Sequence, residues 1–252
     1  MMRNWTMAML PLAMALSGCN GDGKSGEHGA KQDERAAPTG PATTQSFDLK
    51  GFTGVKVAGP DDVTIRQGDA FAISATGPKD EIDELEITLD GAMLSIGRKR
   101  EGFSFSRHDS DGVKIAITMP KLDTLRLTGS GSIDADTLDA DAAKLDVTGS
   151  GDLTVGKLTA KSADLGVSGS GNIEIKGGTV ATGDFGITGS GDIDAEGLAA
   201  QTLDISITGS GDVDAQATVS AAINILGSGD AKVSGGGKCT TKAMGSGTAT
   251  CK

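Results

Sequence analysis

The chain has 252 residues, of which 39 are glycine, one is tryptophan and none is tyrosine. This length suffices for a large domain, but the aromatic residues that usually help fill a globular core are scarce, so the core must be built from small aliphatic side chains. The formal net charge is −11, from 23 basic and 34 acidic residues. Because a phosphate backbone would be repelled by this charge, we expect no nucleic-acid partner.

Residues 1–18 have the features of an export signal. Arg3 supplies the positive end, and the apolar run from Met7 to Leu16 is too short to span a bilayer. The run ends in Leu16-Ser17-Gly18-Cys19, which resembles a bacterial lipobox. That resemblance implies that Cys19 becomes the first mature residue and carries the lipid, and Asn20 after it favours the outer membrane. The alternative is an ordinary signal peptide followed by an incidental cysteine.

Residues 19–45 are predicted to form a lipidated, disordered tether. The segment is rich in Gly, Ala, Thr and Pro with mixed charge, and it has no apolar period. A flexible chain of this length has a root-mean-square span of about 28 Å. We therefore expect the folded domain to stand away from its membrane, in a localisation at the bacterial cell envelope.

Residues 46–120 are predicted to form an N-terminal β region. Alternating apolar residues indicate strands around 55–57, 63–66, 71–75 and 113–119, and a hairpin around Asp90-Gly91. One helical turn is expected near 80–86. Because the first coil of a solenoid needs protection, this region would cap that end, either by continuing the solenoid or as a separate sheet.

Residues 121–252 contain a regular internal repeat, and 46–252 are expected to form one domain. The tripeptide Gly-Ser-Gly begins at Gly129, Gly149, Gly169, Gly189, Gly209, Gly227 and Gly245. The first four intervals are identical, and each of the last two is shorter by two positions. Recurrence of this kind indicates a solenoid, in which each coil buries its apolar edge only against neighbouring coils.

The repeat predicts an all-β protein, a right-handed parallel β-helix of about 20 residues per coil. Apolar or small residues around each tripeptide alternate with polar ones, as in Leu145, Val147, Leu153 and Val155, and a period of two is typical of strands. A leucine-rich repeat is the rival. It fails because serine occupies the column where that class needs Asn or Cys, and no helical period lies between the tripeptides.

The chain resembles the auto-transporter adhesin head GIN domain family over about residues 47–250. The matching segments, in the family's order and spacing, are Phe52 to Gly59, Val63 to Asp69, Gly91 to Ile96, Val113 to Leu122 and the chained "T-G-S-G-D-I" motifs. The resemblance implies an exported bacterial β-protein of unassigned activity. It transfers no catalytic residue.

Cys239 and Cys251 are the cysteines that remain after lipidation of Cys19. An exported compartment permits their oxidation, so we expect a disulfide that closes the last coil and stabilises it by about 3 kcal/mol. Two free thiols are the alternative.

Acidic residues recur in two neighbouring outward columns of successive coils and form a candidate weak cation or ligand face. The residues are Asp152, Asp192, Asp194, Asp212, Asp214 and Asp230. A solvated acidic face that also accepts hydrogen bonds from turn N–H groups is the competing interpretation, and we favour it over a metal site.

The chain lacks a recognisable catalytic set. The serine column has no base nearby in sequence, because the domain holds one histidine, His108. The basic cluster of Arg98, Lys99, Arg100 and Arg107 with Phe103 and Phe105 is a modest candidate for contact with an anionic surface.

The leading hypothesis is a non-catalytic, lipid-anchored envelope β-helix that serves as an adhesin or ligand-binding scaffold. It would be a monomer without cofactor, bound to the membrane by the lipid on Cys19, with an envelope glycan or protein as partner. The alternatives are a polysaccharide-active enzyme that uses the acidic columns and a self-associating envelope scaffold.

Overall fold

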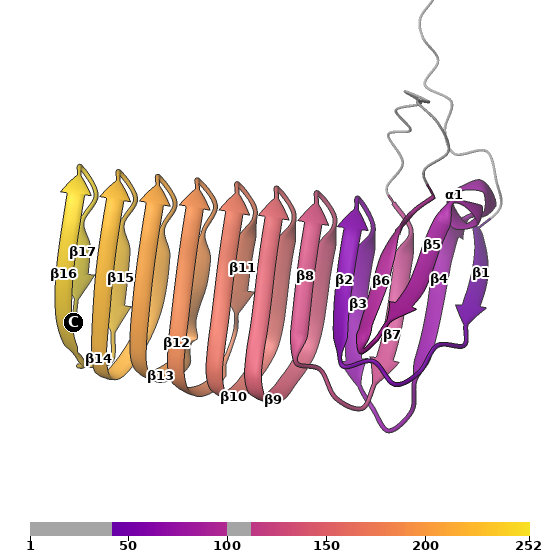
Figure 1. The fold of residues 1–252 in the computed structure, drawn as a ribbon, viewed down its shortest axis with the longest axis horizontal. Helices are drawn as coiled ribbons and strands as arrows, with labels where there is room; N and C mark the ends of the chain where they lie inside the picture. Colours follow the sequence, from indigo (N-terminus) through magenta and orange to yellow (C-terminus); the bar gives the residue numbers. More distant parts are fainter. Residues whose placement is uncertain (1–41, 100–111) are drawn as a thin grey trace, which may run out of the picture. The chain divides into compact units, whose positions relative to one another are not determined.

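The computed structural model describes residues 42–99 and 112–252, which are mostly strand (Figure 1). The first elements are β1 (Ala42–Phe47), β2 (Gly54–Gly59), β3 (Asp62–Gln67), β4 (Ala72–Pro78), α1 (Lys79–Asp83), β5 (Leu85–Asp90), β6 (Met93–Arg98) and β7 (Lys114–Met119). The repeats form β8 (Thr124–Gly129), β9 (Ser132–Gly149), β10 (Asp152–Gly169), β11 (Asn172–Ile175), β12 (Gly178–Gly189), β13 (Ile193–Gly209), β14 (Val213–Gly227), β15 (Ala231–Ser234), β16 (Lys238–Gly245) and β17 (Ala249–Cys251). The all-β prediction is confirmed.

The Gly-Ser-Gly repeats stack as parallel coils, which confirms the predicted β-solenoid. Strand β10 pairs with β9 at an offset of one full repeat, so that Leu153 lies beside Ile133 and Leu165 beside Leu145. This pairing covers three segments, 152–155, 157–160 and 162–169, with single unpaired residues between them. Each coil therefore has three straight sides joined by corners, and equivalent residues of successive coils form columns.

The shortening of the later repeats is absorbed at the two corners between residues 195 and 202. Between β13 and β14, the register shifts between Ala195 and Ala199 and again between Ala200 and Thr202. Beyond these irregularities the columns realign, so that Ile205 pairs with Ile223 and Gly209 with Gly227. The shorter coils thus keep the inward columns of the longer ones.

The N-terminal region both continues the solenoid and caps it. Strands β2 and β3 form a coil that pairs in parallel with β8 and β9. On the other side of this coil, β6 and β7 pair in parallel with β2 and β3 as a further coil. The chain therefore builds an inner coil first and returns later to place an outer coil on it.

Antiparallel strands cover the outer coil. Strand β4 pairs antiparallel with β7, β1 pairs antiparallel with β4, and β5 with β6 forms the hairpin expected around Asp90-Gly91. Because β1 begins at Ala42, residues 42–45 belong to the sheet and the predicted tether boundary at residue 45 is wrong for these four positions. These residues form backbone hydrogen bonds with β4, which is distant in sequence, so the local sequence does not indicate that they are ordered in a strand.

A buried ion cluster joins the cap to the inner coil. The Arg98 guanidinium at the end of β6 bonds both carboxylate oxygens of Asp61, which is fully buried, and lies 2.5 Å from Glu81 Oε2 of α1. Burial by itself lowers the pKa of Arg98, but the hydrogen bonds and charges of Asp61 and Glu81 outweigh it and raise this pKa. Asp61 also accepts the Val113 N–H at 2.9 Å. Arg98 is thus a structural residue of the cap.

The core runs through the coils as columns of Val, Ile, Leu and Ala, as the composition predicts. Phe52 and Phe185 are the aromatic residues among its largest fully buried side chains. Phe52 packs against Phe71, with ring centroids 4.8 Å apart, near the cap. The inward residues around the tripeptides have odd numbers, whereas three buried leucines have even numbers: Leu138, Leu158 and Leu198. They also point inward because the chain turns a corner before each of them.

Successive coils approach each other closely at the Gly-Ser-Gly corners. The Gly149 carbonyl accepts hydrogen bonds from the N–H groups of Ser170 and Gly171, at 2.8 and 3.0 Å. A Cβ on Gly149 would lie 2.5 Å from the Gly129 carbonyl oxygen, and its φ of 120° is unfavourable for other residues. The inner N-terminal coil uses Gly59-Pro60-Asp61 at this corner, since the Gly59 carbonyl accepts from Gly131 at 3.0 Å.

The corner geometry predicts that Gly191→Ala destabilises the protein strongly. Its Cβ would collide with the Gly171 carbonyl oxygen and lie 2.9 Å from Val167 Cγ1. We expect a loss of about 3 kcal/mol of unfolding free energy, measured by urea denaturation. The matched control is Gly186→Ala, whose Cβ meets open space and which should leave stability unchanged or slightly higher. Equal stability of the two variants would contradict close approach at the corners.

Candidate functional site

Most of the predicted acidic residues form a ladder of hydrogen bonds along the solenoid. One carboxylate oxygen of Asp192 accepts the backbone N–H of Asp212 at 2.9 Å, and Asp212 accepts that of Asp230 at 2.7 Å. At the start of the column, Asn172 Nδ2 donates to Asp152 at 2.8 Å, and Asn172 Oδ1 accepts the Asp192 N–H at 3.1 Å. The side chains of Asn172, Asp192 and Asp212 therefore each replace a backbone acceptor at the point where the next strand begins.

The ladder ends at Thr248. Asp230 Oδ1 accepts the Thr248 hydroxyl at 2.8 Å and the Thr248 N–H at 2.7 Å, and these two bonds lower the pKa of Asp230. The carboxylates thus accept N–H groups at the turns, as the competing interpretation of the acidic face describes. Their role as a cation or ligand face stays a prediction.

The remaining two predicted acids occupy the neighbouring column. Asp194 accepts the Glu196 N–H at 3.2 Å, and Asp214 lies 3.3 Å from Lys232 Nζ. Asp194 and Asp214 are adjacent in the register of β13 and β14. Within residues 42–99 and 112–252, no group of three or more His, Cys, Asp and Glu residues is arranged to hold a metal ion.

A groove lies on a different side of the coils, over the long segments that precede each Gly-Ser-Gly corner. Its volume is about 440 Å³. The column along its floor runs from Lys56 and Arg126 through Asp146 to Gly166 and Gly186, which are neighbours in the strand register. Because the two glycines add no side chains, the floor is lowest there, and a Cβ on Gly186 would meet nothing within 4 Å.

One side of this groove is lined by polar residues. Thr148, Ser168 and Thr188 provide hydroxyl groups along one side. The column two residues earlier in each strand borders the groove without being part of its lining, and it holds Asp164 and Asp184. The carboxylate within the lining itself is that of Asp146, so a ligand in the groove would meet hydroxyl groups and this carboxylate.

Charges are arranged unevenly along the groove. At its N-terminal end Arg126 lies 3.3 Å from Asp146, and Lys56 is exposed beside it. In the column of acids, Lys144 pairs with Asp164, whereas burial and then the charges of Asp164 and Asp204 raise the pKa of Asp184. The groove is therefore cationic at one end, and an acidic column borders it.

Sequence reasoning missed this groove. A signal was present, because Gly166 and Gly186 occupy the position that Arg126 and Asp146 hold in earlier repeats. Glycine outside the corner motif of a strand marks a place where a side chain is dispensable or another group approaches closely. Only alignment of the repeats by their structural register shows that these two glycines are neighbours.

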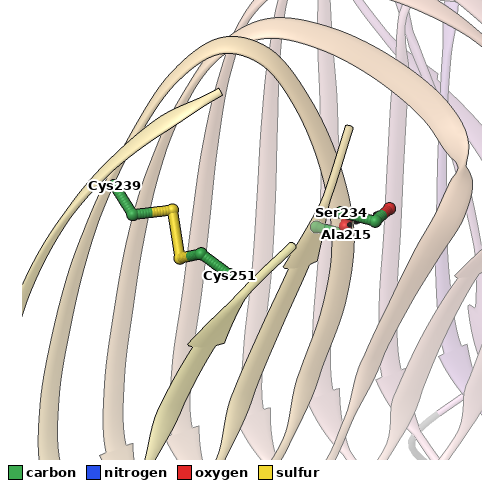
Figure 2. The surroundings of a disulfide bond; sticks show 4 residues. All are labelled: Ala215, Ser234, Cys239 and Cys251. Carbon is green, nitrogen blue, oxygen red and sulfur yellow. Dashed lines mark hydrogen bonds between the residues drawn. A yellow bond between two sulfur atoms is a disulfide. The ribbon is translucent and has the colours of Figure 1, made fainter. Parts of the chain in front are cut away.

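The predicted disulfide is present. Cys239 of β16 and Cys251 of β17 are bonded, with Cα atoms 6.5 Å apart, and the bond crosses between the two strands (Figure 2). Their partners in the preceding coil are Ala221 and Val233, both buried, so the bridge lies over the end of the apolar columns. The bond therefore holds together two sides of the last described coil.

Several other candidates lie outside the described residues. These are Cys19, Arg100, Phe103, Phe105, Arg107 and His108. Of the basic cluster, Arg98 belongs to the buried ion cluster and Lys99 donates to the Asp83 carbonyl at 2.6 Å.

Among the described residues, none of the helical structure is long and apolar enough to cross a bilayer.

The family comparison matches the greater part of the chain. The profile of the family described as "Putative auto-transporter adhesin, head GIN domain" matches residues 51–237. The chain belongs to this family. The match begins near β2 and ends after β15, so the head GIN domain includes the inner N-terminal coil as well as the repeats. A search of curated proteins found no match.

Solved structures share this head GIN fold. A crystal structure described as "a putative adhesin" from Bacteroides fragilis is 21% identical, covers 85% of this chain and 99% of its own, and has a TM-score of 0.76. A "putative lipid binding protein" from Parabacteroides distasonis is 22% identical, covers 85% and 98%, and has a TM-score of 0.65. A "putative adhesin" from Parabacteroides merdae is 21% identical, covers 85% and 97%, and has a TM-score of 0.66. At these identities the likeness shows the fold alone.

The hydrogen-bond ladder of this head GIN domain predicts different effects for two substitutions at Asp212. Asp212→Ala removes the acceptor for the Asp230 N–H and should cost about 1 kcal/mol of unfolding free energy. Asp212→Asn keeps an oxygen acceptor, as Asn172 does in the same column, and should stay within about 0.5 kcal/mol of the parent. Chemical denaturation at neutral pH measures both. An equal loss in the two variants would show that the ladder does not depend on the acceptor.

Proposed function

We propose that this protein is a non-catalytic, adhesin-like binding scaffold of the bacterial cell envelope, anchored by lipid on Cys19. Membership of a family described as an adhesin head domain supports the binding role and a location at the envelope or cell surface. The Leu16-Ser17-Gly18-Cys19 tetrad supports the anchor. The observation that carries the proposal is the groove, because it is a concave, polar surface built on stacked strands.

The groove suits an extended ligand that both donates and accepts hydrogen bonds. Hydroxyl groups of Thr148, Ser168 and Thr188 can donate or accept, and the carboxylate of Asp146 accepts. A polyhydroxylated chain has both kinds of group in every unit. We therefore propose an envelope glycan as the ligand class. Placing such a site on strands locked by neighbouring coils keeps it rigid, which lowers the entropy cost of binding.

The polysaccharide-cleaving alternative has less support. Four acids of the two columns would be the candidates for it, and they are engaged in the structure, since Asp192 and Asp212 accept N–H groups of the next coil and Asp194 accepts that of Glu196. The fourth, Asp214, lies beside Lys232. These contacts give the acidic columns a structural role in the coils, so a catalytic pair of carboxylates is not needed to account for them.

The binding proposal predicts that filling the groove abolishes binding without unfolding the protein. Gly186→Val places a β-branched side chain where a Cβ has open space, and it should weaken binding of the ligand at least tenfold, or about 1.4 kcal/mol. The measurement is a glycan and envelope-component array, with and without calcium, followed by titration of each hit. Thr159→Val, on another side of the coil, is the matched control. Hits that bind Gly186→Val as tightly as the parent would place the site elsewhere.

The anchor is tested by metabolic labelling with palmitate in a bacterial host. We expect the parent chain to incorporate label and to fractionate with membranes, and Cys19→Ser to lose both properties. Cys239→Ser is the control and should retain the label, because that residue lies in the folded domain. An unlabelled parent chain would contradict lipid anchoring while leaving the groove experiment unaffected.

A further inference from the structure

The last described coil differs from the rest of the protein in charge. Residues 231–252 contain four of the 23 basic residues and none of the 34 acidic ones, although the whole chain has a net charge of −11. Lys232 is paired with Asp214, but Lys238 and Lys242 of β16 are exposed and have no ion-pair partner within the described segments. A local positive surface thus ends an acidic solenoid.

Apolar side chains lie beside these lysines. Leu226 and Met244 are neighbours in the register of β14 and β16, and they are 52% and 67% exposed. They continue the column that holds Thr188 and Thr208 in earlier coils, so large apolar groups replace hydroxyl groups only here. A hollow of about 580 Å³ adjoins them, with Lys242 and Ala243 in its lining.

The outer side of this coil has no partner among the described residues. Strand β16 pairs with β14, and β17 pairs with β15, each through one edge (Figure 1). The inward positions of β16 include Thr241 and Ala243, and both are exposed. We call the surface formed by Leu226, Lys238, Lys242 and Met244 the tip.

Charge complementarity selects an occupant for the tip. A second copy placed edge to edge would bring lysines against lysines, and lysine on an edge strand discourages pairing with another chain. An anionic bilayer attracts each lysine near its surface by about fivefold in affinity, and large apolar side chains insert at the boundary between headgroups and acyl chains. The same surface combines both features.

We propose that the tip binds the surface of an anionic phospholipid bilayer. Lys238 and Lys242 contact the headgroups, and Leu226 and Met244 insert beside them. The tip involves other residues than the groove and does not depend on the lipid at Cys19. It gives the head GIN domain a second, reversible contact with a membrane, independent of the ligand held in the groove.

The test uses residues 37–252, a compact unit that contains the whole described core and every described strand pairing. Co-sedimentation is measured with vesicles of phosphatidylglycerol and phosphatidylcholine, and with vesicles of phosphatidylcholine alone. We expect binding to the anionic vesicles only. Raising NaCl from about 0.1 M to about 1 M shortens the Debye length from about 10 Å to about 3 Å and should release the protein.

Variants separate the tip from the overall charge. Lys238→Gln with Lys242→Gln should weaken binding to anionic vesicles about 25-fold, because each lysine contributes about fivefold. The control, Lys157→Gln with Lys161→Gln, makes the same change in net charge on β10 and should leave binding unchanged. Met244→Ser should also weaken binding while preserving the salt dependence. All these side chains are exposed, so thermal unfolding should match the parent.

Three results would overturn the proposal. They are equal binding to both kinds of vesicle, an equal loss in the control pair, and a concentration-dependent mass in light scattering that Met244→Ser abolishes. The last would assign the tip to a second copy of the chain. None of these results bears on glycan binding in the groove, so failure of the tip and failure of the proposed function are distinguishable.

Discussion

Backbone contact between successive coils at the Gly-Ser-Gly corners keeps the whole stack in register. The carbonyl of the first glycine in one coil accepts the N–H of the serine of the next coil and, at most corners, that of its second glycine, and the approach leaves no room for a Cβ at either glycine. These contacts repeat from Gly59 to Gly245, including the corner where Pro60 and Asp61 replace serine and glycine. Fixed corners align all residues between them, so that side chains inside and outside the coil form columns.

Such columns give the protein its surfaces as well as its core. Inward columns of Val, Ile and Leu stabilise the stack although aromatic residues are scarce, since each side chain is covered by its equivalents in the neighbouring coils. Outward columns have different roles, and the residue type in each column determines its role. The column from Asp152 to Asp230 completes backbone hydrogen bonding at the strand starts, whereas glycine at positions 166 and 186 opens a groove in another column. The two columns have different roles because the first lies at a corner, where strands begin, and the second lies on a straight side of the coil.

The two ends of the stack are protected by different means. At the N-terminal end, antiparallel strands and the ion cluster of Arg98, Asp61 and Glu81 cover the outermost coil. At the last described coil, the disulfide between Cys239 and Cys251 lies over the apolar columns, and lysines line the edge strand. Covalent closure is effective there because a coil with a neighbour on one side has fewer packing contacts to keep it from fraying.

The amino-acid sequence was sufficient to predict the strand period, the coil length, the Gly-Ser-Gly corners and the cysteine pair, because each of these is a local or strictly periodic pattern that stacking converts into structure. Three-dimensional packing was needed to establish that β6 and β7 lie outside β2 and β3, since chain order does not specify on which side of a coil a later coil is added. The same holds for the pairing of residues 42–45 with β4 and for the burial of Arg98 against Asp61. The groove belongs to this second group, because Gly166 and Gly186 are one full coil apart in sequence and become neighbours only through the parallel register.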